Sequence, residues 1–122
     1  MNVLELFEKY EKAANVIVSH YSDVFIKTVE DSTAPDEFKE FARQQHVDEE
    51  TIAEIIENAP RGAFDVFDKH EIYIEISVVL QEKSASFIYF INSKSADVYY
   101  PTRKEAEAAA VETAFEILNN KL

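Results

Sequence analysis

Four residues in one short segment, Asp65, Asp68, His70 and Glu71, carry the side chains that bind metal ions. Carboxylate oxygens and imidazole nitrogens ligate divalent cations, and a bound cation can activate water for hydrolysis. One hypothesis is therefore a metal-assisted hydrolase with these four residues as ligands. The same spacing is also typical of a polar turn between two strands, and nothing in it is specific to a metal. We therefore favour the turn.

Other catalytic motifs are missing from the sequence. It contains no cysteine, which excludes disulfides, Cys-ligated zinc and a thiol nucleophile. Gly62 is the single glycine, so the glycine-rich loops that bring backbone amides against phosphates are also excluded. The histidines at 20, 46 and 70 are far apart, and no His-Glu-x-x-His pattern or nucleophile elbow is present. We expect neither enzymatic activity nor a cofactor.

The distribution of acidic residues is the most informative chemical feature. The chain has 24 Asp and Glu against 12 Lys and Arg, a net charge of -12. Residues 30–57 hold ten acids and two bases, a net charge of -8, whereas residues 61–122 have a net charge of only -3. The negative electrostatic field of such a segment attracts basic surfaces and repels nucleic acid. The residues we expect to bind a partner, as stand-ins for phosphates, are Asp36, Glu37, Glu40, Asp48, Glu49, Glu50, Glu54 and Glu57.

These features predict a small non-enzymatic interaction protein that binds a basic, nucleic-acid-binding surface of a partner protein and does not bind nucleic acid directly. DNA-mimicking antirestriction and anti-CRISPR inhibitors of phages and mobile elements share its small size, concentrated acid and lack of catalytic motifs. The comparison is one of class, because no motif is shared. The alternative is an acidic face that only confers solubility.

Helices are expected to position these acids. Apolar residues at three-to-four spacing predict a helix from Asn2 through Tyr21, while residues 24–29 fit either helix or strand. The segment 32–36 combines hydroxyls, a proline and an acid, as helix starts do. The helix that follows should end around His46 and bury Phe38, Phe41 and Ala42.

Asp48 is expected to cap a further helix. Its apolar face would comprise Ile52, Ile55, Ile56 and Ala59, with Glu50, Glu54 and Glu57 in one stripe on the opposite face. The acids of this helix also argue against a DNA-binding helix-turn-helix over residues 41–56, because phosphates would repel them. An ordinary pair of helices is expected instead.

The pattern becomes strand-like after Gly62. Residues 71–80 alternate apolar and polar, 81–84 read as a hairpin turn, and 85–92 form a second strand. A turn at 93–96 and a short third strand at 97–100 should follow, and residues 63–67 fit a further strand. Thr102 and Glu105 have capping-box spacing at the start of the last helix. The small-residue face of that helix comprises Ala106, Ala110, Ala114, Ile117 and Leu118.

The expected fold class is α+β, with N-terminal helices, an antiparallel meander of three to four strands and a C-terminal helix packed on the sheet. We expect a single domain over residues 1–122, divided into a helical part (1–60), the sheet (61–100) and the closing helix (101–122). The start lacks signal-peptide features and no apolar run is long enough to span a membrane, so we expect a cytoplasmic protein without membrane contact.

The second face of the sheet suggests an alternative function. If no helix covers that face, it would be a homodimer interface or a small-ligand pocket, with function on Tyr73, Tyr89 and Tyr99.

Overall fold

The computed structural model describes residues 1–44 and 47–122, and its fold is α+β as predicted. The expected helix end at His46 lies outside the described residues. The helices are α1 (Val3–Lys9), α2 (Glu11–Glu30), α3 (Asp36–Gln44), α4 (Glu49–Asn58), the 3-10 helix η1 (Pro60–Ala63), α5 (Phe64–Asp68) and α6 (Arg103–Lys121). The strands are β1 (Ile74–Gln81), β2 (Ser84–Ile91) and β3 (Lys94–Ser95).

The N-terminal helical segment is two helices rather than one. Tyr10 has a non-helical backbone, with φ of -121° and ψ of 69°, and separates α1 from α2. This break lets the chain change direction, so that Phe7 of α1 and Ile17 of α2 both enter the core. The segment 24–29, which was open between helix and strand, is helical because α2 continues to Glu30.

The core lies where α1, α2, α4 and α6 meet. Phe115 of α6 is fully buried, and its ring lies 5.8 Å from the rings of both Phe7 and Phe67. The small-residue face of α6 was predicted correctly: Ala106, Ala110, Ala114 and Leu118 are fully buried, and Ile117 is partly buried against the core. The predicted N-cap is also confirmed, because Thr102 Oγ1 accepts a hydrogen bond of 3.1 Å from the backbone N–H of Glu105.

The sheet is a three-stranded antiparallel meander in the order β1-β2-β3. The β1–β2 pairing runs from Ile74 opposite Ile91 to Gln81 opposite Ser84, and a two-residue turn joins the strands. The third strand was predicted at 97–100, which is wrong. β3 lies at Lys94–Ser95, and of the later residues only Tyr100 forms an isolated bridge, to Phe87.

The strand predicted at 63–67 is also wrong. These residues form the end of η1 and most of α5. Pro60 opens this helical turn, and Ala63, Val66 and Phe67 are all buried at three-to-four spacing. The run is too short for its periodicity to distinguish a strand from a helix.

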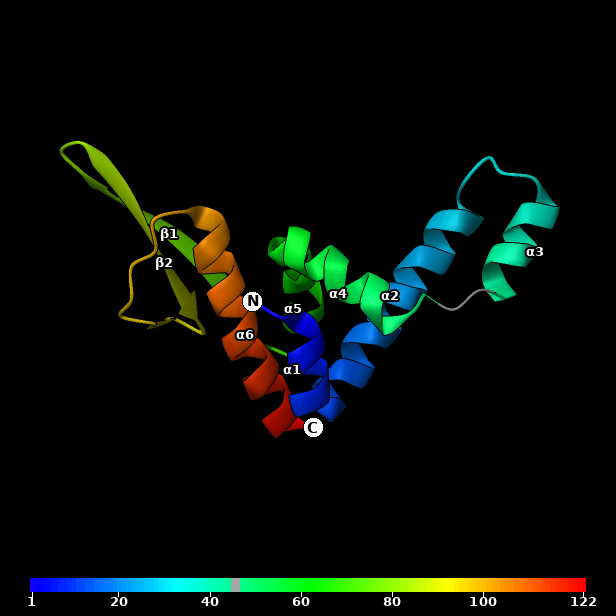
Figure 1. Cartoon of the computed structure of the whole chain (residues 1–122), viewed down its shortest axis with the longest axis horizontal. Coiled ribbons are helices and arrows are strands. Elements are labelled where there is room, and N and C mark those ends of the chain that lie inside the picture. The colour runs from blue at the N-terminus through cyan, green and yellow to red at the C-terminus, as the bar shows by residue number, and fades with distance from the viewer. Residues whose placement is uncertain (45–46) are drawn as a thin grey trace.

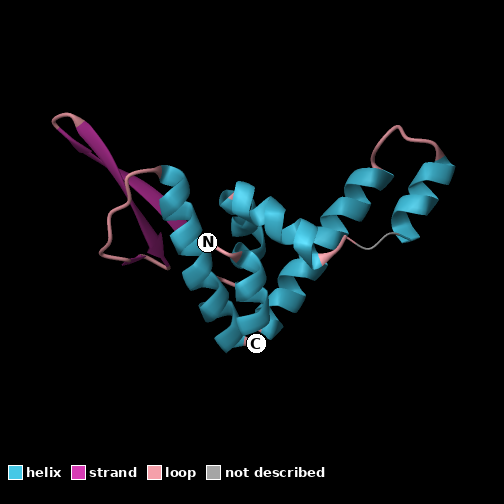
Figure 2. Cartoon of the chain, viewed as in Figure 1, coloured by secondary structure: helices cyan, strands magenta, loops and turns pink. Residues whose placement is uncertain are grey.

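Two hairpins project from opposite sides of the core. Figure 1 shows the β1–β2 hairpin reaching beyond the N-terminal end of α6 on one side, and the end of α2 with α3 on the other. Figure 2 shows that all strands lie on the first side and only helices on the second. The second projection, residues 22–44, is called the helical arm below.

Candidate interaction surface

The helical arm carries three of the predicted partner-binding residues. Asp36, Glu37 and Glu40 lie on α3 and are exposed. Asp36 and Glu37 occupy the first turn, where the free backbone amides and the helix dipole favour negative charge. Their position on a projection makes them accessible to a partner (Figure 1).

Two of the three bases of the arm, Lys39 and Arg43, are engaged close to Glu30. Arg43 Nε donates to Glu30 Oε1 at 3.0 Å, and Lys39 Nζ donates to the Glu30 carbonyl oxygen at 2.9 Å. Both contacts join α3 to the end of α2. Among the described residues the Arg43–Glu30 contact is the only salt bridge of the arm, so the carboxylates of Asp36, Glu37 and Glu40 are not paired with a base.

The apolar residues of the arm are more exposed than the sequence indicated. Phe38 and Phe41 were expected to be buried, but 54% and 59% of their surfaces are exposed, and on α3 only Ala42 is buried. The reason is that α3 packs mainly on α2, and one helix covers only a narrow stripe. Val24 and Phe25 of α2 are also exposed, at 49% and 40%. The arm therefore presents phenylalanine side chains together with carboxylates.

Two of the predicted residues at α4, the N-cap Asp48 and Glu57, make hydrogen bonds that stabilise the fold. Asp48 caps α4 by accepting a hydrogen bond of 2.7 Å from the backbone N–H of Thr51, and hydrogen bonding to Thr51 holds the Asp48 pKa below its usual value. Glu57 Oε1 accepts a 2.9 Å hydrogen bond from the backbone N–H of Val3, at the start of α1. Glu57 is partly buried, so the predicted stripe on α4 is reduced to its first two members, Glu50 and Glu54.

The other acids of α4 face solvent. Glu49, Glu50 and Glu54 are exposed, and so is Ile55, which the sequence had placed on the buried face but which is 44% exposed. Ala59 is exposed as well. The helix packs mainly on α1 and η1, whereas α3 packs on α2. The structure therefore divides the eight predicted residues between two separately supported helices instead of gathering them on one face.

The acidic surface also includes residues that the sequence did not single out. A hollow of about 310 Å³ beside Glu49 is lined by Glu8 and Glu11, together with Phe7, Ala14 and Asn15. These two glutamates lie on α1 and α2, far from α4 in the sequence. Only tertiary packing brings them next to Glu49, so local charge counting could not find them.

The proposed metal ligands do not form a site. Asp65 and Asp68 lie on α5, and His70 and Glu71 lie in the turn that follows it. No three His, Asp or Glu side chains of the described residues converge as a metal site requires. The backbone carbonyl of His70 instead accepts a hydrogen bond from Lys121 Nζ, and that of Glu71 accepts one from Asn92 Nδ2. The alternative interpretation, a polar turn between two strands, is correct only for His70 and Glu71, and their turn joins helix α5 to β1.

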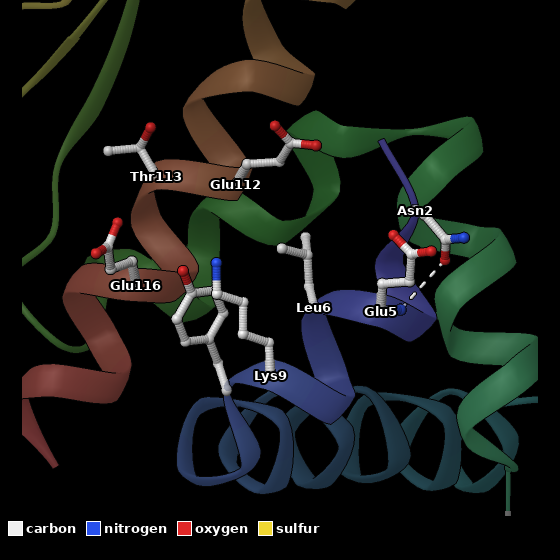
Figure 3. A pocket seen from close by; sticks show the side chains of 8 residues that line it. Asn2, Glu5, Leu6, Lys9, Glu112, Thr113 and Glu116 are labelled. Carbon is white, nitrogen blue, oxygen red and sulfur yellow. Dashed lines mark hydrogen bonds between the residues drawn. The ribbon is translucent and has the colours of Figure 1, made fainter.

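A second group of carboxylates lines a hollow of about 350 Å³ between α1 and α6 (Figure 3). Glu5, Glu112 and Glu116 surround it together with Lys9. Lys9 Nζ lies 5.3 Å from the centre of the Tyr10 ring. These carboxylates, too, do not form a group that could hold a metal.

The tyrosines of the sheet do not share one face. The Tyr89 hydroxyl lies 2.9 Å from Thr113 Oγ1 on α6, and the Tyr89 ring stacks on Tyr100. Tyr73 and Tyr99 are 56% and 61% exposed. Tyr89 is thus part of the packing between sheet and helix, and the three-tyrosine surface of the alternative function is not formed.

Comparisons with protein-family models, with curated proteins and with solved structures find no match to this chain. None of the described helices has both the length and the apolar character needed to cross a membrane.

Proposed function

We propose that this chain is a non-catalytic interaction protein that binds a basic surface of a partner protein through the helical arm. Glu37 and Glu40 provide charge, and Phe38 and Phe41 provide apolar anchors. The exposed Glu50 and Glu54 of α4 form a separate acidic face. The observation that supports this proposal most directly concerns α3. This projecting helix has carboxylates without basic partners next to exposed aromatic rings.

The side chains of this surface suit a protein partner that is bound through apolar contacts as well as through charge. Protein interfaces combine aromatic anchors with a polar rim, and buried aromatic residues contribute most of the binding energy. Carboxylates around the anchors speed association with a basic surface and select for it. A nucleic-acid-binding groove is the basic surface that an acidic inhibitor would occupy. The proposed class is therefore an inhibitor that mimics nucleic acid, of the antirestriction or anti-CRISPR kind.

The test uses immobilised chain to capture proteins from a bacterial lysate at low salt, followed by elution with rising salt. The test variant is Glu37→Lys with Glu40→Lys. The matched control is Glu112→Lys with Glu116→Lys, which changes the net charge equally on exposed positions of α6. We expect a basic nucleic-acid-binding protein to bind the wild type and the control, to be lost with the arm variant, and to be displaced by duplex DNA.

Two results would contradict the proposal. One is capture that is unchanged by reversing the arm charges. The other is a captured protein that binds duplex DNA and this chain at the same time. Glu57 is excluded from the variants because its hydrogen bond to Val3 supports the fold.

A further inference from the structure

The outer edge of β1 carries a row of unpaired backbone groups. The hydrogen bond of 2.9 Å from Asn92 N–H to the Tyr73 carbonyl sets the alternation, so the odd-numbered residues of β1 bond to β2. The backbone N–H and C=O groups of Ile74, Ile76, Val78 and Leu80 therefore point away from β2. Because the strand order is β1-β2-β3, no strand of the described residues lies on that side.

This edge lacks the features that normally prevent pairing between edges. Natural proteins protect edge strands with proline, lysine, bulges or very short strands. β1 has eight residues, contains no proline or lysine, and carries Glu75 as its one charged residue. Val78 and Leu80 are 46% and 78% exposed. A long apolar edge of this kind favours the addition of another strand.

We propose that the strand added is β1 of a second copy of this chain, antiparallel across a two-fold axis, giving a continuous six-stranded sheet. Two-fold pairing places side chains on the same face opposite each other, and the greatest overlap of Ile74–Gln81 with its copy puts the axis beside Ser77 or Val78. Glu75 then faces Val79 or Gln81 of the second copy and never another Glu75. No like charges are placed opposite each other along the edge.

A hollow beside β1 fits the side chain that this pairing delivers. With the axis at either position, Leu80 of the second copy lies opposite Ile74 or Ile76. These two isoleucines line a hollow of about 230 Å³ together with Phe64, and four charged residues, Arg61, Glu75, Arg103 and Glu107, complete its lining. A cavity of about 150 Å³ accommodates benzene, so the hollow has room for a leucine side chain. The most exposed large apolar residue of the chain thus meets a partly apolar hollow on its own copy.

The charge of the sheet is compatible with self-association. Residues 72–100 hold three acids and two bases, a net charge of -1, whereas the acid is concentrated in residues 30–57. The helical arm projects from the opposite side of the core, so its carboxylates stay away from the β1 edge (Figure 1). Pairing through β1 therefore leaves the surface of the proposed function free.

The first test combines sedimentation with amide hydrogen exchange on the wild-type chain, from micromolar to millimolar concentration. We expect a dimer in which the amides of Ile76 and Val78 become protected as the concentration rises. The Val79 amide, which already bonds to β2, should change little. If the chain stays monomeric over this concentration range, the β1 edge does not pair with a second copy and the proposal is wrong. A dimer whose even-numbered amides remain unprotected overturns it as well.

The second test places a charge on the proposed contact. Leu80→Lys removes the leucine from both copies and should weaken dimerisation roughly 100- to 10,000-fold, since each leucine that is no longer buried costs about 10- to 100-fold. Ala85→Lys is the matched control, because Ala85 is exposed and lies directly opposite Leu80, equally close to the hairpin turn, but on β2, away from the edge. Equal dimerisation of the Leu80 variant and the control would overturn the proposal. The exchange experiment decides the question if either variant fails to fold.

Discussion

Replacing Tyr21 with phenylalanine should stabilise the fold. The Tyr21 hydroxyl is buried and has no hydrogen-bond partner among the described residues. It faces Gly62, where an added Cβ would lie 3.6 Å from the hydroxyl oxygen. Burial, with a smaller contribution from the charge of Asp65, raises the pKa of Tyr21 to about 12. The hydroxyl is therefore shielded from bulk solvent and has no protein partner among the described residues.

The size of the effect follows from the cost of burying an unpaired polar group. That cost is about 1–3 kcal/mol, and phenylalanine keeps the ring and its packing while removing the oxygen. We expect Tyr21→Phe to raise the free energy of unfolding by about 1–2 kcal/mol. For a domain of this size the corresponding rise in Tm is roughly 3–8 °C.

Thermal and urea unfolding of three variants measures the effect with internal controls. Tyr89→Phe removes a hydroxyl that is hydrogen-bonded to Thr113 and should lower stability by about 1 kcal/mol. Tyr73→Phe changes an exposed ring and should leave stability unchanged. A Tyr21→Phe variant that is less stable than wild type would refute the reasoning, because the hydroxyl would then have a partner.

The pH dependence gives an independent check on Tyr21. A raised pKa means that the folded state keeps the proton more tightly than the unfolded state. The wild type therefore has its full stability below pH 10 and loses stability as the pH rises from 10 toward about 12. Tyr21→Phe should lose less stability over that range. Parallel curves for the two proteins would contradict the burial of the hydroxyl.

Three further predictions concern local features of the fold. Thr102→Ala removes the cap of α6 and should lower the unfolding free energy by about 1 kcal/mol, measured by urea unfolding; no change would mean that the cap is not used. The lowered pKa of Asp48 means that its stabilising contribution is present above its usual pKa of 3.8 and is lost as the pH falls through the folded value. Asp48→Asn, which caps without a charge, should therefore lose less stability in acid, and an identical acid transition would argue against the cap. Phe115→Ala should cost about 3–5 kcal/mol, whereas Phe41→Ala should cost little because that ring is exposed; equal losses in thermal unfolding would contradict the burial pattern.

The features that were predicted correctly are local. The caps at Asp48 and Thr102 involve residues three positions apart, so the sequence contains both partners of each hydrogen bond. The β1–β2 hairpin follows from alternation and a turn that joins neighbouring strands. The small-residue face of α6 is visible from its spacing alone.

The failed predictions concern segments whose environment is set by distant parts of the chain. Phe38 and Phe41 have helical spacing, but whether they are buried depends on how many elements surround α3, and among the described residues it packs mainly on α2. The segment 63–67 is apolar enough for either strand or helix, and contacts with the core select the helix. Tyr10 interrupts a pattern that would otherwise continue, because the break lets both helices reach the core.

The sequence by itself determined that acid is concentrated in residues 30–57, because charge is a property of composition and position along the chain. Only the tertiary structure decided what each carboxylate does. It assigned Asp48 and Glu57 to hydrogen bonds that hold helix termini and left Glu37 and Glu40 exposed on a projecting arm. It also left the edge of β1 open. Such differences depend on which backbone groups and side chains come within hydrogen-bonding distance, and that is fixed by packing between elements far apart in the chain.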